Sequence, residues 1–390
     1  MRAKRVFFIV LDGMGMGEAP DAALFGDTGA FTLQSVYKSG ALRIPYLTRL
    51  GLGNLPNLSF LGHTDAPTAS IARLQEASQG KDTTIGHWEL AGHISHAPLP
   101  TFPNGFPTEF LQRFSQAVGR EILCNRPYSG TDVIRDYGEE HLRTGALIVY
   151  TSADSVFQVA AHTDVVPLEE LYDVCRTARK MLTGELAVGR VIARPFCGNT
   201  PDFKRTADRR DFSLAPPVRM MTDAIRDAGL DSISVGKISD IFAGRGITQA
   251  VSTHSNEEGM AETLRLARTD FCGLCFVNLV EFDSLWGHRR DPRGYAEGLS
   301  RFDAWLGEFL PCLREDDVLI ITADHGCDPA YLKTTDHTRE YVPFLLYSPS
   351  LCPQDLGTRR TFADAGATVA ALLCVDFVCD GSALPLKNLS

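Results

Sequence analysis

The sequence predicts an α/β fold, with a mostly parallel sheet flanked by helices and a second, smaller domain inserted into it. Three observations predict this fold. Short, almost continuous apolar runs rich in β-branched and aromatic residues recur along the chain, helical patterns lie between some of them, and proline-rich turns set off the middle segment. Strands that are apolar on both faces and alternate with helices are typical of a parallel sheet covered on both sides.

The predicted strands come in a clear order. The first spans residues 5–12 ("RVFFIVLD"). Five more follow, at 146–154, 189–196, 232–240, 273–283 and 317–326. Helical patterns at 257–270 and 295–313 lie before the last two strands, as expected for strand–helix–strand units.

The middle of the chain has a different character. Proline-rich turns occur at 99–107 and 214–218, and the segments between them could form a small sheet of their own. We therefore expect a core domain made of residues 1–100 and 219–390, with an inserted domain at 101–218.

Length and composition limit the classes of protein to consider. The 390 residues, 44% hydrophobic and 22% charged, suit a globular protein of two domains. There are 48 acidic residues against 38 Lys and Arg, so the formal charge is −10, which argues against a nucleic-acid partner. No apolar run approaches the roughly 18 residues of a membrane span, and the run at 6–11 is too short for a secretory signal. We expect neither nucleic acid nor membrane as a partner.

The cysteines point to a reducing compartment. The ten cysteines are scattered without regular spacing, which is typical of a reduced, cytosolic protein. One C-x-x-C at 272–275 lies in an apolar run with no second pair nearby. We interpret it as two buried strand cysteines and not as a zinc or redox site.

Acidic and imidazole side chains gather where predicted strands end. In an open parallel sheet all carboxyl ends lie along one edge, where ligands usually bind, so residues far apart in sequence can converge there. The strand ends and the loop at 334–341 contribute six such residues: Asp12, Asp283, His288, Asp324, His325 and His337. Taken singly, such an Asp more often caps a turn and such a His is usually structural, but their coincidence at three strand ends favours a shared site.

Three Asp and three His suit two divalent metal ions. Carboxylates and imidazoles favour Mn²⁺, Zn²⁺ or Mg²⁺ over metals that prefer thiolates. Two ions about 3.5–4 Å apart can hold both the attacking and the leaving oxygen of a phosphoryl displacement. The pattern therefore indicates phosphoryl transfer at a two-metal centre.

The segment "GKDTTIGH" at 80–87 has two open interpretations. It is not a Walker A motif, because Gln75 stands where the first glycine belongs and Asp82 follows Lys81. Asp82 or one of the two threonines after it could cap the helix that "HWELAG" suggests. Alternatively, a threonine hydroxyl activated by a metal could accept a phosphoryl group as a nucleophile.

Long motifs across the chain carry a family resemblance. They are "FFIVLDGMGMGEAPDAALFGDTGAFT", "GKDTTIGHWELAG", "YTSADSVFQVAAHTDVVPLEELY", "GRVIARPFCG", "RRDFSLAPP", "VGKISDIFAGRGIT", "NLVEFDSLWGHRRDPRGY" and "ITADHGCDPAYLKTTDHTREYVPFLLYSP". With them the chain resembles the prokaryotic phosphopentomutases of the alkaline phosphatase superfamily. The resemblance covers nearly the whole chain at nearly the family's length.

The resemblance implies a fold and a catalytic set. The fold is an alkaline-phosphatase-like core with an inserted α+β cap domain. The nucleophile is the threonine after Lys-Asp, which is Thr83, and it is phosphorylated in the active enzyme. Two Mn²⁺ ions are implied, with these ligands: Asp12, Thr83, Asp283, His288, Asp324, His325 and His337.

The resemblance also implies a reaction. It is the interconversion of ribose 1-phosphate and ribose 5-phosphate, and of the 2-deoxyribose pair, through a 1,5-bisphosphate, which links nucleoside catabolism to pentose phosphate metabolism. A sugar bisphosphate, either glucose 1,6-bisphosphate or ribose 1,5-bisphosphate, is the expected activator. The expected partners are small pentose phosphates, the expected location is the cytoplasm, and the expected state is a monomer.

Several polar residues in the matched motifs are candidates for substrate binding. Arg binds a phosphate through its two-pronged guanidinium and Lys as a point charge. The basic candidates are Lys81, Arg194, Arg209, Arg210 and Lys237. Asp154 could accept a sugar hydroxyl, whereas His87 and Trp88 beside the nucleophile are expected to be structural. For each basic residue the alternative is an ordinary surface ion pair.

The chain departs from the family pattern at two places. "DGMGMG" at 12–17 carries two methionines beside Asp12, and Ile85 replaces a threonine.

Three competing functions would fit parts of the same pattern. A phosphatase or phosphodiesterase could share the metals and the nucleophile but would lack the match to the cap domain. Cofactor-independent phosphoglycerate mutase is longer and has a serine nucleophile. A sugar-phosphate sensor would not need Thr83.

Overall fold

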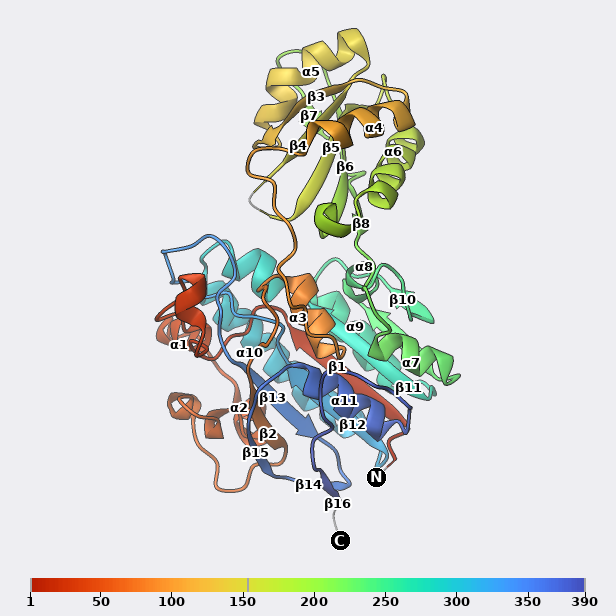
Figure 1. The fold of residues 1–390 in the computed structure, drawn as a ribbon. Helices are drawn as coiled ribbons and strands as arrows, with labels where there is room; N and C mark the ends of the chain where they lie inside the picture. Colours follow the sequence, from red (N-terminus) through yellow and green to blue (C-terminus); the bar gives the residue numbers. More distant parts are fainter. Residues whose placement is uncertain (1, 153, 389–390) are drawn as a thin grey trace. The chain divides into compact units, whose positions relative to one another are not determined.

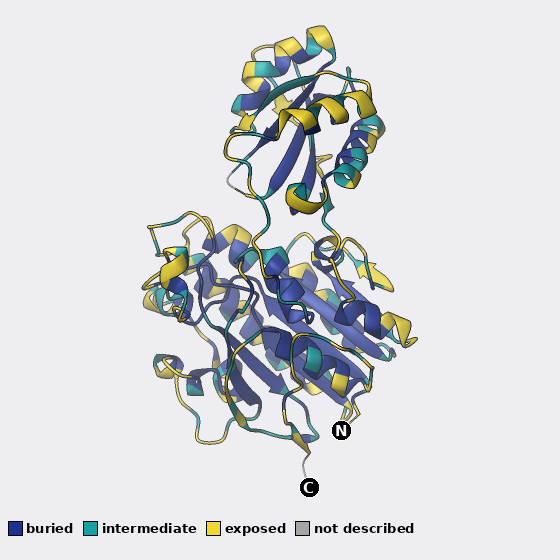
Figure 2. Ribbon diagram, in the orientation of Figure 1, coloured by how far each residue is buried: buried dark blue, intermediate teal, exposed yellow. Residues whose placement is uncertain are grey.

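The chain divides into two compact units. The computed structural model describes residues 2–152 and 154–388 (Figure 1). One unit combines Met1–Pro98 with Pro216–Ser390, and the other is Leu99–Ala215. In both units the central strands are buried, and the exposed residues concentrate on helices, loops and short outer strands (Figure 2).

The first unit, hereafter the core unit, is built on an eight-stranded sheet. In spatial order its strands are β10 (Gln249–Val251), β9 (Asp231–Val235), β11 (Gly273–Leu279), β1 (Arg5–Leu11), β12 (Asp317–Thr322), β13 (Val342–Tyr347), β2 (Ser70–Leu74) and β15 (Asp355–Arg359). Only β13 runs against its neighbours, so the sheet is mostly parallel. A two-stranded ladder joins β14 (Leu351–Cys352) to β16 (Lys387–Asn388).

Helices cover both faces of this sheet (Figure 1). One group contains α1 (Thr32–Lys38), α2 (Pro45–Leu50), α9 (Asn256–Ala267) and α10 (Pro292–Phe309). The other contains α3 (Thr83–Leu90), α7 (Met221–Asp227), α8 (Ile238–Ile241) and α11 (Ala363–Leu372). Short 3₁₀ turns lie at Ala22–Phe25, Leu52–Asn54, Ser59–Leu61 and Leu310–Cys312, and a π-helical turn, η5, lies at Phe282–Gly287.

The predicted fold class of the core is confirmed. Every residue of β1, β11 and β12 is buried, which is why their sequences are continuous apolar runs and do not alternate. The free energy of burying both faces of a strand is available only when helices cover both sides of the sheet, as they do here.

Several predicted strands extend too far, and two of them continue into helical segments. The run at 273–283 ends as a strand at Leu279 and continues into η5, so Asp283 lies in a helical turn and not on the strand. The run at 232–240 ends at Val235, because Gly236 adopts a left-handed conformation (φ 76°) and α8 follows. A short apolar run does not distinguish a strand from a buried helical turn.

The second unit, hereafter the inserted unit, has its own sheet. Its strands are β3 (Ile122–Pro127), β4 (Leu147–Thr151), β5 (Val156–His162), β6 (Arg190–Cys197), β7 (Lys204–Arg205) and β8 (Arg210–Ser213). Its helices are α4 (Thr108–Val118), α5 (Asp132–Thr144) and α6 (Leu168–Met181), with a 3₁₀ turn at Gly184–Leu186. Separate apolar clusters fill the two faces of this sheet, so the unit has its own core.

The cysteines are free, and the C-x-x-C prediction holds for one of its two residues. All ten cysteines are free thiols. Cys275 is buried in β11 as expected, whereas Cys272 is half-buried and lies just before the strand. In the part of the chain that the structure describes, no helix has the length and apolar character that crossing a membrane requires.

A buried ion pair closes the amino end of β1. Arg5 and Asp317 are both fully buried. Arg5 Nε donates to Asp317 Oδ1 at 2.8 Å, and Arg5 Nη1 donates to the carbonyl oxygens of Ala267 and Thr269. The pair thus ties β1 and β12 to the end of α9.

We expect Arg5→Met to lower the free energy of unfolding by about 3–5 kcal/mol, because Asp317 would keep a buried charge without its partner. Urea denaturation measures the change. The double variant Arg5→Met/Asp317→Leu removes both charges and should recover much of the loss. Equal stability of the single variant and the parent would show that the pair contributes nothing.

Candidate active site

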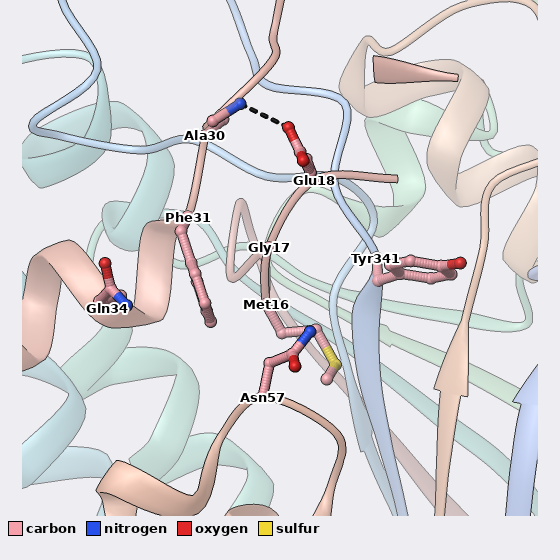
Figure 3. Close-up of a pocket in the computed structure, with 9 residues that line it drawn as sticks. Met16, Gly17, Glu18, Ala30, Phe31, Gln34, Asn57 and Tyr341 are labelled. Atoms are coloured by element: carbon pink, nitrogen blue, oxygen red, sulfur yellow. Dashed lines mark hydrogen bonds between the residues drawn. The ribbon is translucent and has the colours of Figure 1, made fainter. Parts of the chain in front are cut away.

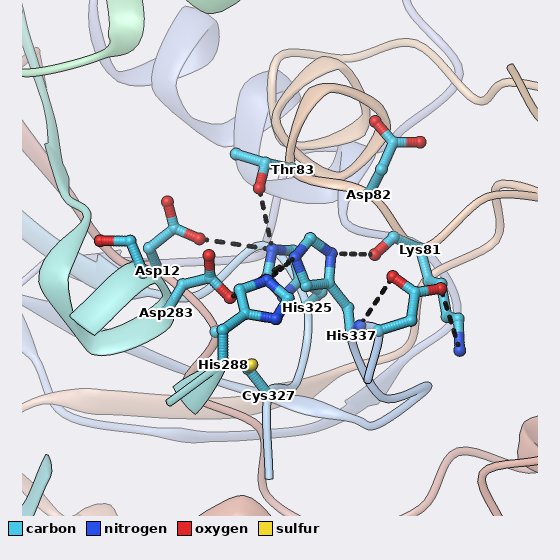
Figure 4. A network of polar contacts seen from close by, with 12 residues as sticks. Asp12, Lys81, Asp82, Thr83, Asp283, His288, His325, Cys327 and His337 are labelled. Atoms are coloured by element: carbon cyan, nitrogen blue, oxygen red, sulfur yellow. Dashed lines mark hydrogen bonds and ion pairs between the residues drawn. The ribbon is translucent and has the colours of Figure 1, made fainter. Parts of the chain in front are cut away.

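Three neighbouring strands bring the predicted acidic residues to one edge of the core sheet. Strand β1 lies between β11 and β12, with Leu11 paired with Leu279 and Val10 paired with Thr322. The residues that follow these strands therefore emerge side by side. The structure brings together all six predicted ligands and Thr83 in the core unit (Figure 4).

The six side chains form two adjoining groups. In the first, His325 Nε2 lies 3.3 Å from Asp12 Oδ1 and 3.2 Å from Asp324 Oδ2. In the second, Asp283 Oδ1 lies 3.3 Å from His288 Nε2 and 3.4 Å from His337 Nε2. The rings of His325 and His337 stack with centroids 3.7 Å apart, which joins the two groups.

Backbone carbonyls set the orientation of all three imidazoles. Nδ1 of His288 lies 3.2 Å from Thr335 O, Nδ1 of His325 lies 3.1 Å from Gly326 O, and Nδ1 of His337 lies 2.8 Å from Lys81 O. An Nδ1–H donated to a carbonyl leaves a lone pair on Nε2. Each Nε2 then points into the site as a metal ligand would.

The carboxylates provide a matching set of oxygen atoms. Asp12 Oδ1, Asp283 Oδ1 and Asp324 Oδ2 are buried and receive no hydrogen bond, although imidazole nitrogens of the three histidines lie 3.2–3.4 Å from them. Buried carboxylate oxygens are costly unless a cation or a donor satisfies them. Three such oxygens facing three Nε2 atoms fit divalent ions that accept nitrogen and oxygen ligands.

The pKa of His325 reports the negative charge of the site. Burial alone would lower the pKa of this ring, but the charges of Asp324 and Asp12 outweigh it and raise the pKa well above its usual value. The same balance raises the pKa of His87, where Asp324 opposes burial. The site therefore favours positive charge.

The helix-cap interpretation of the 80–87 segment is confirmed, and the nucleophile interpretation stays a prediction. Asp82 is the N-cap of α3, and its Oδ1 accepts from the backbone N–H groups of Thr84 and Ile85. Thr83 is the first residue of the helix and is half-buried, with Oγ1 3.1 Å from His325 Nε2. The cap thus fixes the helix start, and the helix start points the hydroxyl at the six-residue cluster.

The two sequence departures have simple structural accounts. The side chain of Ile85 is buried and packs beside Gly80, so it belongs to the core. Met14 and Met16 are buried as well. Neither departure removes an atom from the cluster around Thr83.

A pocket of about 230 Å³ lies apart from this cluster (Figure 3). Met16, Phe31, Asn57 and Tyr341 are among the residues that line it, and none of the predicted site residues does. Its one carboxylate, Glu18, accepts a hydrogen bond from the backbone N–H of Gly29. The pocket offers no group for phosphoryl transfer.

Comparison with known proteins identifies the family. The family model of the Metalloenzyme superfamily matches residues 4–377. A phosphopentomutase of Lachnoclostridium phytofermentans is 55% identical over 368 residues, 94% of either chain. One from Deinococcus radiodurans is 54% identical over 94% of this chain and 95% of the relative, and one from Clostridium novyi is 50% identical over 99% of each.

The chain belongs to the phosphopentomutase family. The resemblance seen in the sequence is therefore confirmed. Among solved structures, the PH0037 protein from Pyrococcus horikoshii is similar with a TM-score of 0.51 at 14% identity, over 96% of this chain and 98% of that one. At that identity the likeness supports the fold alone.

Buried residues behind the predicted ligands complete the site of this phosphopentomutase family member. Asn278 Nδ2 donates to Asp12 Oδ2 at 2.8 Å and lies 3.3 Å from His87 Nε2. His87 Nδ1 lies 2.8 Å from Thr83 O and 3.1 Å from Asp324 Oδ2. His87 is fully buried and joins helix α3, which begins at Thr83, to a predicted ligand, which fits the structural role expected for it.

We expect Asn278→Ala to weaken the binding of a divalent metal ion, with Mn²⁺ as the probe, by roughly 10–100-fold, because Asp12 would lose the donor that orients its carboxylate. Isothermal titration calorimetry measures the affinity. Val277→Ala removes a buried side chain from the same strand and serves as the control for general destabilisation. If both variants bind Mn²⁺ equally well, Asn278 does not orient a ligand.

A second, partly buried network holds the segment just before Thr83 and the loop that carries His337. Arg339 is fully buried, pairs with Glu76 and Asp21, and donates through Nη1 to Gly80 O. Lys81 Nζ lies 2.9 Å from Asp27 Oδ2 and 3.5 Å from Asp336 Oδ2. The sequence does not predict this network, because nothing in it indicates which of these charged residues form pairs.

The other predicted substrate-binding residues are divided between the two units. Lys237 is exposed at the start of α8 in the core unit. In the inserted unit, Asp154 is exposed and 4.0 Å from Arg190 Nη2. Arg210 stacks over the rings of Tyr172 and Phe212.

Arg194 and Arg209 share one environment in the inserted unit. Arg194 Nε donates to Gln158 Oε1 at 3.1 Å, and Arg209 is bonded through two nitrogens to Asp211. Burial and then the charge of Arg209 lower the pKa of Arg194. Burial raises the pKa of the Tyr150 hydroxyl, whereas the charges of Arg194 and Arg205 lower it. Arg205 therefore lies near Tyr150 and belongs to the same basic cluster.

Proposed function

We propose that this protein interconverts ribose 1-phosphate and ribose 5-phosphate, and the 2-deoxyribose pair, through phosphorylated Thr83 and a sugar 1,5-bisphosphate. The observation that carries the proposal is the position of Thr83 Oγ1, 3.1 Å from His325 Nε2 within a cluster of three Asp and three His. Membership of the phosphopentomutase family supports the choice of substrate.

We propose that the two adjoining groups hold two divalent ions, and that these are Mn²⁺. One group is Asp12, Asp324 and His325, and the other is Asp283, His288 and His337. The orphaned carboxylate oxygens and the oriented Nε2 atoms support this assignment. When bound, such ions offset the negative charge of the transferring phosphoryl group.

In the proposed transfer, every bond that breaks is matched by one that forms, and no water molecule takes part. The bond between Thr83 Oγ1 and phosphorus breaks, a bond from the free sugar hydroxyl to phosphorus forms, and the hydroxyl proton ends on Thr83 Oγ1. The bisphosphate then reorients, and its other phosphoryl group returns to Thr83 by the reverse step. Because Asp82 caps the start of helix α3, Thr83 is held at one place for both steps.

We propose Arg194, Arg209 and Lys237 as phosphate-binding residues and Asp154 as an acceptor for a sugar hydroxyl. The basic cluster around Tyr150 supports the two arginines, because guanidinium groups bind phosphate in a two-pronged way. Lys81 and Arg210, also predicted for this role, are engaged with carboxylates and with aromatic rings. We propose that Lys81 positions its loop and Arg210 its strand β8, and that both contribute less to phosphate binding.

Priming by a sugar bisphosphate, glucose 1,6-bisphosphate or ribose 1,5-bisphosphate, follows from the proposed phosphothreonine, because the cycle must begin with Thr83 phosphorylated. We also propose a cytoplasmic location, which ten free cysteines support. A monomeric state stays a prediction, and light scattering during gel filtration tests it.

The test is to incubate the Mn²⁺-loaded protein with ribose 5-phosphate and a trace of glucose 1,6-bisphosphate. Samples are quenched with chelator and analysed by phosphorus NMR. We expect ribose 1-phosphate to appear without free phosphate, and only slowly if the bisphosphate is omitted. If free phosphate is the main product, the protein acts as a phosphatase and the mutase proposal is wrong. If the protein is fully active although it neither carries nor receives a phosphoryl group, the proposed phosphothreonine intermediate is wrong.

A further inference from the structure

A buried thiol points into one half of the proposed metal centre. Cys327 lies two residues after His325 and is 3% exposed. Its Sγ, an oxygen of Asp283 and a nitrogen of His288 all lie within 4.8 Å of one another. Figure 4 shows the sulfur of Cys327 beside the ring of His288. None of the sequence motifs singled out this residue.

Two glycines leave the space that this thiol occupies. A Cβ added at Gly287 would lie 2.5 Å from Cys327 Sγ, and one added at Gly13 would lie 2.9 Å from Cys327 Cβ. The backbone N–H of Cys327 donates to Gly13 O at 2.9 Å. The thiol is thus held between the residue after Asp12 and the residue before His288.

The surroundings of Cys327 differ from those of an ordinary core cysteine. A buried free cysteine usually behaves as a small apolar side chain. Cys275 is such a case, because it lies in the middle of β11 among apolar residues. Cys327 instead faces Asp283, whose Oδ1 is buried and receives no hydrogen bond, and an imidazole.

We propose that Cys327 Sγ joins Asp283 and His288 in binding a thiophilic divalent cation such as Zn²⁺ or Cd²⁺. Sulfur, nitrogen and carboxylate oxygen together form a ligand set that zinc accepts, whereas Mn²⁺ prefers oxygen and nitrogen. Coordination replaces the S–H bond with a sulfur–metal bond and releases the proton to solvent. This half of the centre therefore accepts softer ions than its Asp and His residues alone would select.

The inference rests on the proposed function only in that Asp283 and His288 are taken as metal ligands. Its test reads the sulfur–metal bond and not catalysis. A protein that lacks mutase activity can still show the bond, and an active mutase can lack it. Failure of one proposal is thus distinguishable from failure of the other.

The experiment titrates the metal-free, full-length protein with Cd²⁺ and follows the ultraviolet sulfur-to-metal charge-transfer band. We expect a band that saturates at one Cd²⁺ per chain, is lost in Cys327→Ser and persists in Cys374→Ser, which removes an exposed thiol. We expect the Cd²⁺ affinity of Cys327→Ser to fall by at least roughly tenfold. A band that survives in Cys327→Ser would overturn the proposal.

A second variant separates loss of the ligand from loss of the fold. His288→Ala keeps the thiol and removes a neighbouring ligand, so we expect it to weaken Cd²⁺ binding as well, with an unchanged circular dichroism spectrum. If Cys327→Ser unfolds, this variant and Cys327→Ala decide the matter. Unchanged Cd²⁺ affinity and an unchanged band in a folded His288→Ala would place the sulfur–metal bond elsewhere and overturn the proposal.

Discussion

Thr83→Ala is expected to reduce mutase turnover by at least about 10⁴-fold, because it removes the atom that the phosphoryl group must occupy between the two transfers. The turnover that remains should be close to the rate that the metal centre supports without a nucleophilic side chain. The side chain is half-buried at the start of α3, so the substitution should leave the fold intact. A coupled assay for ribose 5-phosphate formation measures turnover.

Two matched variants separate the nucleophile from the helix cap. Thr83→Ser keeps a hydroxyl at the same place and should retain measurable turnover. Thr84→Ala removes the adjacent hydroxyl, which has no role in the proposed transfer, and should keep parental turnover. Incubation with labelled glucose 1,6-bisphosphate should label the parent and Thr84→Ala but not Thr83→Ala. Labelling of Thr83→Ala to the parental level would place the nucleophile elsewhere.

The core fold was predictable because burial of both faces of a strand leaves a strong signal. The runs around β1, β11 and β12 are apolar throughout, and strand ends in a parallel sheet converge whatever their distance in sequence. The ends of the strands were harder to predict, because an apolar run continues through Phe282 into η5. Hydrophobicity reports burial there and not backbone conformation.

The convergence of the proposed metal ligands was predictable for the same reason, whereas the residues that contact them from behind were not. Asp12 follows β1 directly, and Asp324 and His325 lie within three residues of the end of β12, so their positions in sequence fix their positions in space. Asn278 lies within a strand and contacts Asp12 across the sheet, and nothing in the sequence pairs the two. Cys327 was passed over because a single cysteine in sequence carries no partner information.

Asp12→Asn is expected to abolish most of the stabilisation that Mn²⁺ gives to the protein. A ligand at one hundred times its Kd stabilises the folded state by about 2.7 kcal/mol, and the variant should lose most of this because its side chain offers the ion no charge. The shape of the side chain is kept, and its oxygen can still accept from Asn278. Calorimetric unfolding with MnCl₂ and with chelator measures the difference.

Mutase turnover of the same variant should fall on the order of 10²–10³-fold, since an electrostatic contribution to the transition state is lost. Parental turnover with an undiminished response to Mn²⁺ would remove Asp12 from the set of ligands. His63→Asn, at an exposed position away from the cluster, controls for the handling of the protein.

The metal-free variant should unfold at the same temperature as the metal-free parent or at a higher one. In the parent, the carboxylates of Asp12, Asp283 and Asp324 are buried close together, and only part of their charge is offset by His325. Removing one charge relieves that repulsion, while Asp324 remains as the partner of His325. A site arranged to bind cations thus lowers the stability of the empty fold, and the bound ion restores it.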